Sequence, residues 1–303
     1  MTKDEILNRV RRLNVYRRGE RRAPHKPLLL LLAIAEQQRG VRKLAYREVE
    51  DPLRKLLDSY APPVQGRHDP SLPYWHLQSD GLWQVTDADT LPRTAGGFPR
   101  MDALQLTVGS LPQDFLGALD SDPTFPSQIT GELLARHFPV SLHDELAAKI
   151  GFTQSTVVAG HVVEYEVSRQ RDPAFRTSVL QAYEQRCAVT GLWLALDGTI
   201  FGCEAAHIKW HAYNGPDKVA NGLALSPTMH KLFDRGAWTL TDDNKVLVSR
   251  NLTGDDTSMQ HLRSHHKKPI RPPLSEKDQP SPEFIKWHRD PGLGGVFKGQ
   301  PLD

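Results

Sequence analysis

Two histidines and an asparagine in the second half of the chain have the chemistry and the spacing of a hydrolytic centre. Asn221 follows His207 by 14 residues, and His230 follows Asn221 by nine. Hydrolysis of a phosphodiester needs an activated water and a cation that offsets charge on the phosphorus oxygens and the leaving group. One neutral imidazole can act as the base while another binds the metal. These residues therefore predict metal-assisted hydrolysis of a phosphodiester.

The elements around these residues are predicted to be a β-hairpin, a loop and a helix. Asp197-Gly198 is typical of a tight turn between strands, and His207 ends the strand that follows. Ser226 is a predicted helix N-cap with proline next to it, and the helix it begins carries His230. Two further elements are predicted before the hairpin, a helix over residues 173–185 and a strand-like segment CAVTGL from Cys187.

The blocks CAVTG, EAAHI, NGLALSP and HKLFDRG resemble the HNH (ββα-metal) nuclease motif over about Ala174–Ser249. The resemblance implies that His207 is the general base that takes a proton from the attacking water. It implies that Asn221 orients this base and pins the loop, and that His230 ligates the divalent metal. The expected enzyme is a metal-dependent DNA endonuclease.

One position departs from the pattern of this family. Many HNH enzymes have Asp or His directly before the base as a second metal ligand, whereas this chain has Ala206. Glu204 lies on the same face of the strand as position 206, so it is the predicted substitute ligand, and a structural carboxylate that supports the site is the alternative. Oxygen and imidazole ligands with open positions favour Mg²⁺ or Mn²⁺. Asp234, four residues after His230, is interpreted as helix-end structure.

The N-terminal 27 residues are strongly basic, with nine Lys and Arg against three acidic residues. A helix over residues 3–14 precedes a loop rich in arginine, and Pro27 is predicted to begin the next helix, which ends near Gln38. Free backbone N–H groups at a helix N-terminus point outward and favour a phosphate there. The segment therefore predicts contact with a nucleic-acid backbone, and a solvated helix face is the alternative.

The segments RAPHKPLLLL, PYWHLQSDGLW and TAGG resemble the sulfur-binding domain that precedes HNH modules in McrA-like, phosphorothioate-dependent restriction endonucleases, over about residues 5–145. The resemblance implies a small apolar cavity for the sulfur that replaces a phosphate oxygen. Sulfur is softer and less hydrated than oxygen, so an apolar wall disfavours ordinary phosphate. The residues implied for phosphate contact are Arg22, His25, Lys26 and Pro27. Those implied for the cavity are Pro73, Tyr74 and His76, and a place in the core is the alternative for Tyr74. Those implied for base reading are Arg93, Gly96, Gly97 and Arg100.

The fold class predicted for the whole chain is α+β, with a mainly helical DNA-reading domain before the ββα-metal domain. The chain of 303 residues is long enough for two domains. The predicted division is a recognition domain over residues 1–150, a linker over 151–165 and a nuclease domain over 166–303. The further elements predicted in the first domain are a helix over 46–60, a hairpin over 73–86, and short helices over 103–106, 114–119, 129–137 and 142–150.

Composition places the chain in a reducing compartment and away from membranes. Two cysteines, Cys187 and Cys203, are too few for a disulfide framework or a four-cysteine zinc site. The apolar run from Leu28 has eight residues, far short of a membrane span, and the first ten residues lack the apolar core of a signal peptide. A cytoplasmic protein is expected.

The prediction is a modification-dependent restriction endonuclease that binds phosphorothioated double-stranded DNA and cleaves nearby. One alternative keeps the nuclease but has the first domain read methylated or unmodified DNA, and base flipping would favour it. Another alternative is a non-catalytic DNA-binding protein. A double-strand break by a module with one site requires a homodimer or two successive nicks, and the sequence leaves both open.

Overall fold

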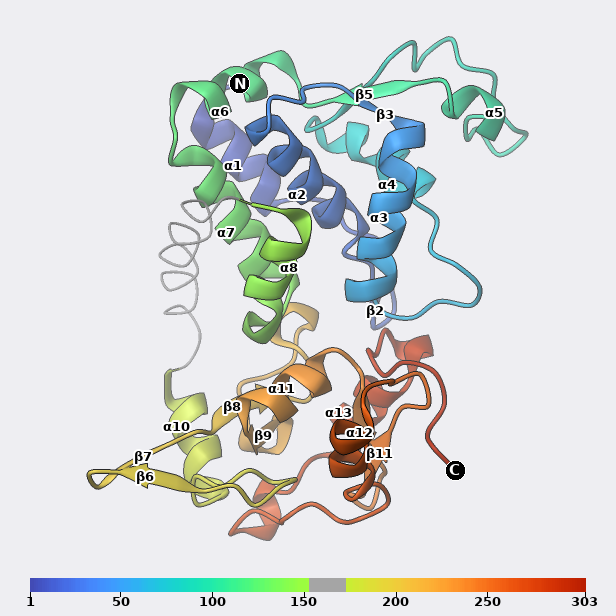
Figure 1. Ribbon diagram of the computed structural model, residues 1–303. Helices are drawn as coiled ribbons and strands as arrows, with labels where there is room; N and C mark the ends of the chain where they lie inside the picture. Colours follow the sequence, from blue (N-terminus) through green and yellow to red (C-terminus); the bar gives the residue numbers. More distant parts are fainter. Residues whose placement is uncertain (153–172) are drawn as a thin grey trace. The chain divides into compact units, whose positions relative to one another are not determined.

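The computed structural model of the protein describes residues 1–152 and 173–303, and it forms two compact units (Figure 1). One unit is built mainly from residues 1–152 and the other mainly from residues 173–303. Helices and small antiparallel sheets occur in both, so the α+β class is confirmed. The linker predicted over 151–165 lies outside the described residues, apart from residues 151 and 152.

The first unit is organised around helix α2 (His25–Gln38). Its residues from Pro27 to Ala35 are all buried, as expected for a helix that is apolar on every side. It packs against α3, α4, α7 and α8 and so forms the centre of this core. Within residues 1–152, the α-helices of this unit are α1 (Lys3–Arg11), α2, α3 (Tyr46–Tyr60), α4 (Ser71–His76), α5 (Met101–Leu104), α6 (Gln113–Ser121), α7 (Phe125–His137) and α8 (His143–Ile150).

Most of the predicted helices of this unit are confirmed, with shifted ends. The helix over 46–60 has the predicted bounds, whereas α1 ends at Arg11, three residues early. Helix α2 begins at His25, so Pro27 lies inside its first turn rather than at its first position. Proline is tolerated there because the first N–H groups of a helix have no partner within it.

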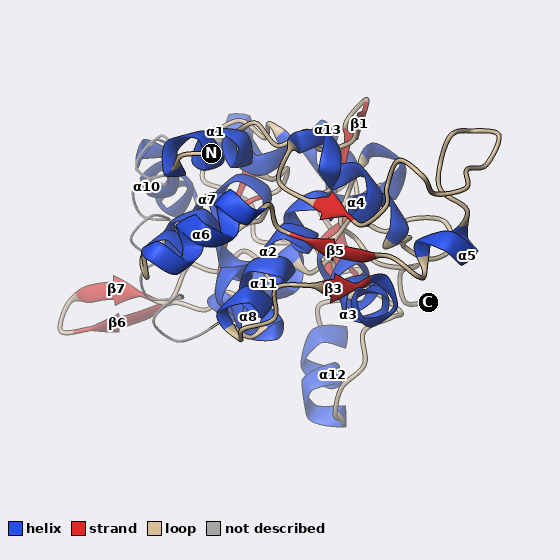
Figure 2. Cartoon of the chain, turned by 90° about the horizontal axis from the view of Figure 1, so that it is seen from above, coloured by secondary structure: helices blue, strands red, loops and turns tan. Residues whose placement is uncertain are grey.

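The described strands of residues 1–152 form a three-stranded sheet, which lies in the first unit, and a hairpin, of which residues Arg18–Arg22 belong to the second unit. The hairpin pairs β1 (Arg17–Arg18) with β2 (Arg21–Arg22) inside the segment predicted to be a loop. The sheet has the order β3-β5-β4 and is antiparallel, with β3 (Leu44–Ala45) and β5 (Val108–Ser110) side by side in Figure 2. Strand β4 (Gln84–Val85) pairs with the other edge of β5.

The hairpin predicted over residues 73–86 is wrong. Helix α4 and the 3₁₀ helix η1 (Leu77–Asp80) occupy most of this segment, and Gly81 ends them with a φ of 67°. Asp69, directly before the N-cap residue Pro70, accepts a hydrogen bond from the Ser71 N–H at 2.9 Å and so satisfies the first free N–H of α4. Tyr74 and Leu77 are both fully buried, and this spacing of three suits a helix. The strand β4 finds its partner in β5 instead.

The second unit contains the predicted strand, loop and helix in order. Strand β8 (Glu204–His207) pairs antiparallel with β9 (Gly222–Leu225), and α10 (Pro173–Ala182) and α11 (Pro227–Asp234) both pack against this pair. His207 therefore ends a strand and His230 lies within a helix, as predicted. The remaining elements are β6 (Leu194–Leu196), β7 (Thr199–Phe201), β10 (Trp238–Leu240), β11 (Val246–Val248), α12 (Asp256–Arg263) and α13 (Pro282–Arg289).

In this unit the predicted turn at Asp197-Gly198 is confirmed, whereas the strand predicted from Cys187 is wrong. Asp197 and Gly198 join β6 to β7 with φ values of 49° and 76°, the conformation of a two-residue hairpin turn. The segment from Cys187 is a turn and not a strand, because the Gly191 N–H donates to the carbonyl of Cys187 at 2.8 Å. Among the described residues, no helix is long and apolar enough to cross a membrane.

Candidate functional site

At the end of β8, His207 contacts Phe175 and Asp217, among other neighbours. Its ring stacks on Phe175 of α10, with centroids 3.9 Å apart and planes 16° from parallel. Its Nε2 lies 2.7 Å from Oδ1 of Asp217. If the carboxylate accepts the Nε2 proton, the lone pair of the neutral ring lies on Nδ1, the nitrogen suited to take a proton. The side chain is 17% exposed, so the ring is largely sheltered yet reachable by water.

Asn221 is fully buried and fixes the loop between β8 and β9. Its Oδ1 accepts from the N–H of Lys209 at 2.8 Å. Its Nδ2 donates to the carbonyls of Lys209 and Pro216, each at 3.0 Å. These three hydrogen bonds need a side chain with one acceptor and two donor positions, and the asparagine amide supplies them. This geometry supports the predicted role of Asn221 in pinning the loop.

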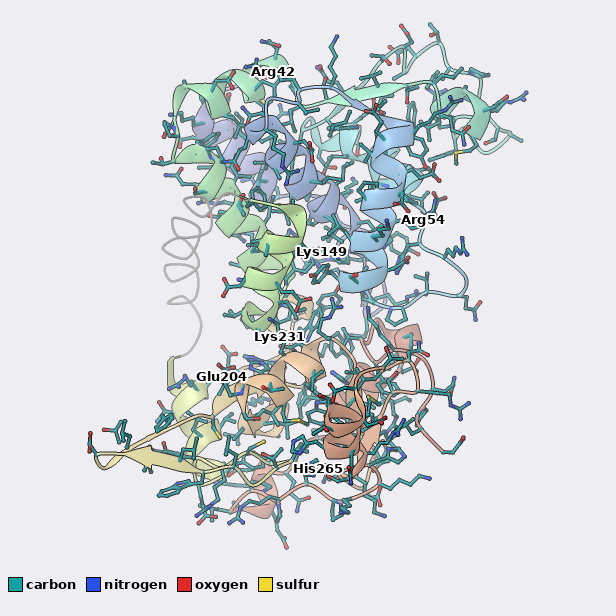
Figure 3. The ribbon with its side chains drawn as sticks, viewed as in Figure 1. Arg42, Arg54, Lys149, Glu204, Lys231 and His265 are labelled. Atoms are coloured by element: carbon teal, nitrogen blue, oxygen red, sulfur yellow. The ribbon has the colours of Figure 1, made fainter. Side chains whose placement is uncertain are left out.

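His230 joins a strand carboxylate to a helix carboxylate. Its Nδ1 lies 2.8 Å from Oε2 of Glu204, which extends from β8 (Figure 3), and its Nε2 lies 3.0 Å from Oδ2 of Asp234. Burial disfavours the charged ring, but the carboxylates of Asp234 and Glu204 outweigh it and raise the pKa of His230 to about 9. The hydrogen bond from His230 in turn lowers the pKa of Glu204. The predicted pair of metal ligands is thus brought together.

The Glu204–His230 pair fits one edge of a six-coordinate cation site. Ligand atoms around Mg²⁺ at about 2.1 Å are about 3 Å from one another, which matches the oxygen-to-nitrogen distance in this pair. Asp234, 2% exposed, accepts from Nε2 and so orients Nδ1 toward Glu204, as carboxylates often do behind metal-binding histidines. Within residues 1–152 and 173–303, no group of three or more metal-binding side chains occurs. Water and phosphate oxygens would have to complete the coordination.

In the first unit, Lys26 connects the start of α2 to the segment that follows α4. Its Nζ lies 2.6 Å from Oδ2 of Asp80, and the two side chains are only 12% and 7% exposed. The other oxygen of Asp80 accepts from the N–H of Asn14 at 2.8 Å. His25, beside Lys26, makes an edge-to-face contact with the ring of His68 at 5.3 Å. Arg22 lies half-buried in β2 and belongs to the second unit, where its guanidinium donates to the carbonyl of Ala212 and lies 5.7 Å from the centre of the Tyr213 ring.

Of the three predicted cavity residues on helix α4, Pro73 and Tyr74 are buried and His76 is exposed. Tyr74 is fully buried, its hydroxyl donates to the carbonyl of Leu44, and its ring contacts Tyr46 and Trp83 in the core. Partial burial and the positive charge of Lys26 lower the pKa of His76. Tyr74 therefore supports the helix from inside instead of lining a surface cavity.

The predicted base-reading loop, residues 91–100, folds into a tight turn against α4. Phe98 contacts His76 at 5.8 Å and Trp75 at 6.3 Å, centroid to centroid. The guanidinium of Arg93 lies 5.2 Å from the Trp75 ring and donates to the carbonyl of Gly97 at 3.1 Å. Gly96 and Gly97 form the exposed tip. Arg100, predicted to read bases with Arg93, is exposed and pairs with Asp102 at 2.9 Å.

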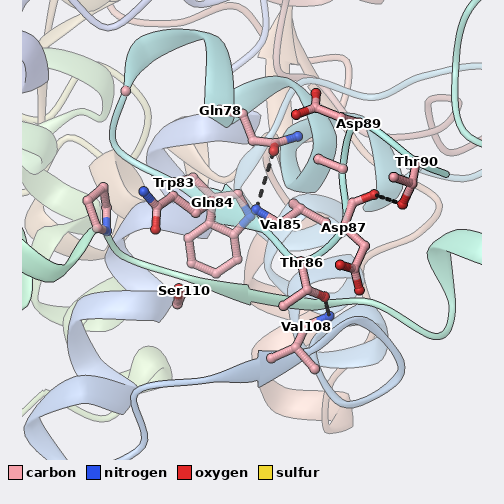
Figure 4. Close-up of a pocket in the computed structure, with 13 residues that line it drawn as sticks. Gln78, Trp83, Gln84, Val85, Thr86, Asp87, Asp89, Thr90, Val108 and Ser110 are labelled. Atoms are coloured by element: carbon pink, nitrogen blue, oxygen red, sulfur yellow. Dashed lines mark hydrogen bonds between the residues drawn. The ribbon is translucent and has the colours of Figure 1, made fainter.

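A pocket of about 740 Å³ lies elsewhere in this unit, along β4 and β5 (Figure 4). Its wall includes Gln78, Trp83 and Ser110, and its rim carries the carboxylates of Asp87 and Asp89. Two carboxylates disfavour a phosphate by like-charge repulsion. None of the residues predicted to bind sulfur or DNA lines this pocket, so it is not the predicted sulfur cavity.

The structure adds residues that the sequence did not single out. The Phe98 ring contacts the rings of Trp75 and His76, and the Asp217 carboxylate makes a hydrogen bond with His207, the predicted base. The spacing of four between His230 and Asp234 was a detectable signal, although the interpretation as helix-end structure missed its contact with the histidine. No periodic pattern marks Asp217, because it lies in an irregular loop.

Comparison with known proteins matches the two parts of the chain to two families. A family model for the ScoMcrA-like DNA sulfur-binding domain matches residues 3–155, and an HNH endonuclease model matches residues 187–241. No curated protein matches the chain.

Three solved structures give the scale of the similarity. The sulfur-binding domain of ScoMcrA complexed with phosphorothioated DNA is 26% identical over 50% of this chain and 97% of that chain, with a TM-score of 0.44. The Type IV phosphorothioation-dependent restriction endonuclease ScoMcrA is 26% identical over 46% of this chain and only 27% of its own, with a TM-score of 0.40. The modification-dependent TagI restriction endonuclease is 27% identical over 39% and 37% of the two chains, with a TM-score of 0.29.

The first family model covers just over half of the chain, and its boundaries enclose α1 to α8. The second encloses His207, Asn221 and His230 with their strand, loop and helix. The chain belongs to the family with a ScoMcrA-like DNA sulfur-binding domain, and it joins this domain to an HNH endonuclease domain, which makes it a DNA endonuclease.

Proposed function

We propose that the chain is a phosphorothioate-dependent restriction endonuclease. The observation that carries this proposal is the coexistence in one chain of a DNA sulfur-binding domain and the Glu204–His230–Asp234 cluster, whose Glu204 lies on the strand that ends at His207. The first domain selects double-stranded DNA in which sulfur replaces a phosphate oxygen. The second hydrolyses a phosphodiester bond near that position.

In the proposed reaction, His207 is the general base. Nδ1 takes a proton from a water as the water oxygen attacks phosphorus, and the bond to the leaving oxygen breaks. Asn221 keeps the loop, and through it the base, in place. A divalent cation, Mg²⁺ or Mn²⁺, would supply positive charge to the phosphate oxygens and the leaving group. Glu204 and His230 would hold it, since they offer one oxygen and one nitrogen at suitable spacing.

DNA recognition is assigned to the exposed side of α4 and its neighbours. The positive charges of Arg22 and Lys26, with His25, lie at or just before the N-terminus of α2, where backbone N–H groups also attract a phosphate. Pro73 and His76 are the residues proposed to contact the sulfur, while Tyr74 anchors α4 in the core. The tip residues Gly96 and Gly97 and the arginines Arg93 and Arg100 belong to the base-reading loop.

A second copy of the chain is the proposed partner for cleavage of both strands. The β6–β7 hairpin extends away from the rest of its unit in Figures 1 and 2. It exposes Trp193, Leu194, Leu196 and Phe201, and exposed apolar surface of this kind favours association. Sedimentation on a cleavable duplex would test this assignment, with Leu196→Asp expected to keep the chain monomeric. The proposed location is the cytoplasm, where the unpaired thiols of Cys187 and Cys203 would stay reduced.

The test compares two duplexes of one sequence, one with phosphorothioates and one without, in binding and cleavage assays with Mg²⁺ or Mn²⁺. The wild-type chain is expected to bind and cut only the sulfur-bearing duplex. His207→Ala is expected to bind it but not cut it, and His261→Ala, an exposed histidine on α12, serves as the matched control. Equal binding of both duplexes would leave a nuclease with another target, such as methylated DNA. Cleavage by His207→Ala would remove the assigned base.

A further inference from the structure

We infer that Asp217 is a positioning residue for the general base, so that the base works as a carboxylate–histidine pair. The inference rests on the proposed function of His207. Asp217 lies ten residues after His207 in the loop between β8 and β9, and no family feature in the sequence assigned it a role. Its Oδ1 lies 2.7 Å from Nε2 of His207, and both side chains are 17% exposed.

Among its contacts, the stacking on Phe175 and the hydrogen bond to Asp217 restrict the orientation of the His207 ring in different ways. Phe175 packs flat against one face of the ring at 3.9 Å, which sets the plane of the imidazole. The ring can still flip within that plane, and a flip would exchange its nitrogens and carbons. The carboxylate of Asp217 prevents this, since it makes a short hydrogen bond to Nε2.

The loop holds Asp217 through the backbone of its neighbours. Asn221 donates to the carbonyl of Pro216, the residue directly before Asp217, and the Lys218 N–H donates to the same oxygen at 2.9 Å. Gly215 packs so closely on Lys209 that an added Cβ would lie 1.8 Å from its carbonyl oxygen. The loop therefore turns tightly just before Asp217. Asn221 thus acts on the base through Asp217, although it does not touch the base itself.

The chemical consequence concerns the proton on the ring. A carboxylate that accepts from Nε2 keeps the neutral ring in the form with its lone pair on Nδ1. When Nδ1 takes a proton from the attacking water, the ring becomes a cation, and the negative charge of Asp217 stabilises it. The same carboxylate therefore selects the correct tautomer before the reaction and offsets charge during it.

Cleavage kinetics of the full-length chain separate this role from a structural one. Asp217→Asn keeps the shape but removes the charge, and it is expected to lower kcat by about 10²-fold or more with little change in the half-saturating DNA concentration. Asp217→Ala should lose at least as much, and Asp217→Glu should recover part of the activity. Asp256→Asn, which removes one exposed charge on α12, is the matched control. The thermal midpoint of Asp217→Asn should equal that of the wild type.

Nitrogen NMR of the metal-free protein provides a readout that does not depend on activity. With ¹⁵N-labelled histidine and a pH at which the ring is neutral, His207 in the wild type should carry its proton on Nε2. Asp217→Ala should show a mixture of the two tautomers.

The results distinguish the two claims. A wild-type kcat and an unchanged tautomer in Asp217→Ala, with His207→Ala inactive, would overturn the positioning role and leave the proposed function intact. Cleavage by His207→Ala at the wild-type rate would overturn both. Loss of activity in Asp217→Asn with an unchanged midpoint, together with the tautomer shift in Asp217→Ala, would support the pair.

Discussion

At the scale of the residue, Asn221 shows how one buried amide controls a loop. Asn221→Asp would keep the acceptor for the Lys209 N–H but lose the N–H groups that bind the carbonyls of Lys209 and Pro216. Buried polar groups left without partners cost about 1–3 kcal/mol each. We expect a lower unfolding midpoint for the second unit in calorimetry and a loss of cutting. A midpoint equal to that of the wild type would contradict this account of the loop.

At the scale of the element, α13 makes the stability of its unit depend on pH. His288 is fully buried, stacks on Phe233 at 3.7 Å and has Thr239 as a hydrogen-bond partner. Burial lowers its pKa from 6.5 to about 4, so the unfolded chain binds the proton more readily. The contribution of neutral His288 to the free energy of unfolding is then fully present above pH 6.5 and is lost as pH falls toward 4. The loss amounts to about 2 kcal/mol between pH 7 and pH 5.

The raised pKa of His230 adds stability as pH falls over the same range. The contribution of His288 is therefore measured by denaturant unfolding as the change, between the two pH values, in the difference in unfolding free energy between the wild type and His288→Gln, and His261→Gln should show no such change.

The loop of residues 91–100 is an element whose shape depends on one side chain. Arg93 donates to the carbonyls of Gly97 and Ala88, each at 3.1 Å, and lies on the ring of Trp75. Arg93→Ala should therefore loosen the tip, speed hydrogen exchange in residues 94–98 and weaken binding of the sulfur-bearing duplex. Arg100→Ala should weaken binding without faster exchange, because Arg100 pairs only with exposed Asp102 among the contacts described for it. Equal exchange in the two variants would argue against Arg93 as the clamp of the loop.

At the scale of the whole molecule, recognition and hydrolysis reside in different units. The proposed cation ligands Glu204 and His230 belong to the second unit, whereas Lys26 and His76 belong to the first. A chelator should therefore abolish cutting of the sulfur-bearing duplex but leave its binding unchanged, and added Mg²⁺ or Mn²⁺ should restore cutting. Electrophoretic mobility and nicking assays on the same samples measure both. Loss of binding with the chelator would mean that the cation also serves recognition.

The sequence by itself determined the elements whose signals are local. The apolar run of α2, the turn at Asp197-Gly198 and the helix that begins after Ser226 each follow from neighbouring residues. The residue types of His207, Asn221 and His230, together with the surrounding blocks that resemble the HNH motif, were enough to predict hydrolytic chemistry.

Tertiary structure decided what depends on distant parts of the chain. Residues 73–81 contain a hairpin signal at Ser79-Asp80-Gly81, but packing of Tyr74 and Leu77 into the core made the segment helical as far as Asp80. The same packing decided which side of α4 faces outward, and it placed Tyr74 on the buried side. Asp217 contacts His207 because hydrogen bonds from Asn221 hold the loop between β8 and β9 in place. This loop is irregular, so its path has no periodic pattern in the sequence. Contacts between residues far apart in an irregular segment leave no pattern in the sequence, and they form only when the chain has folded.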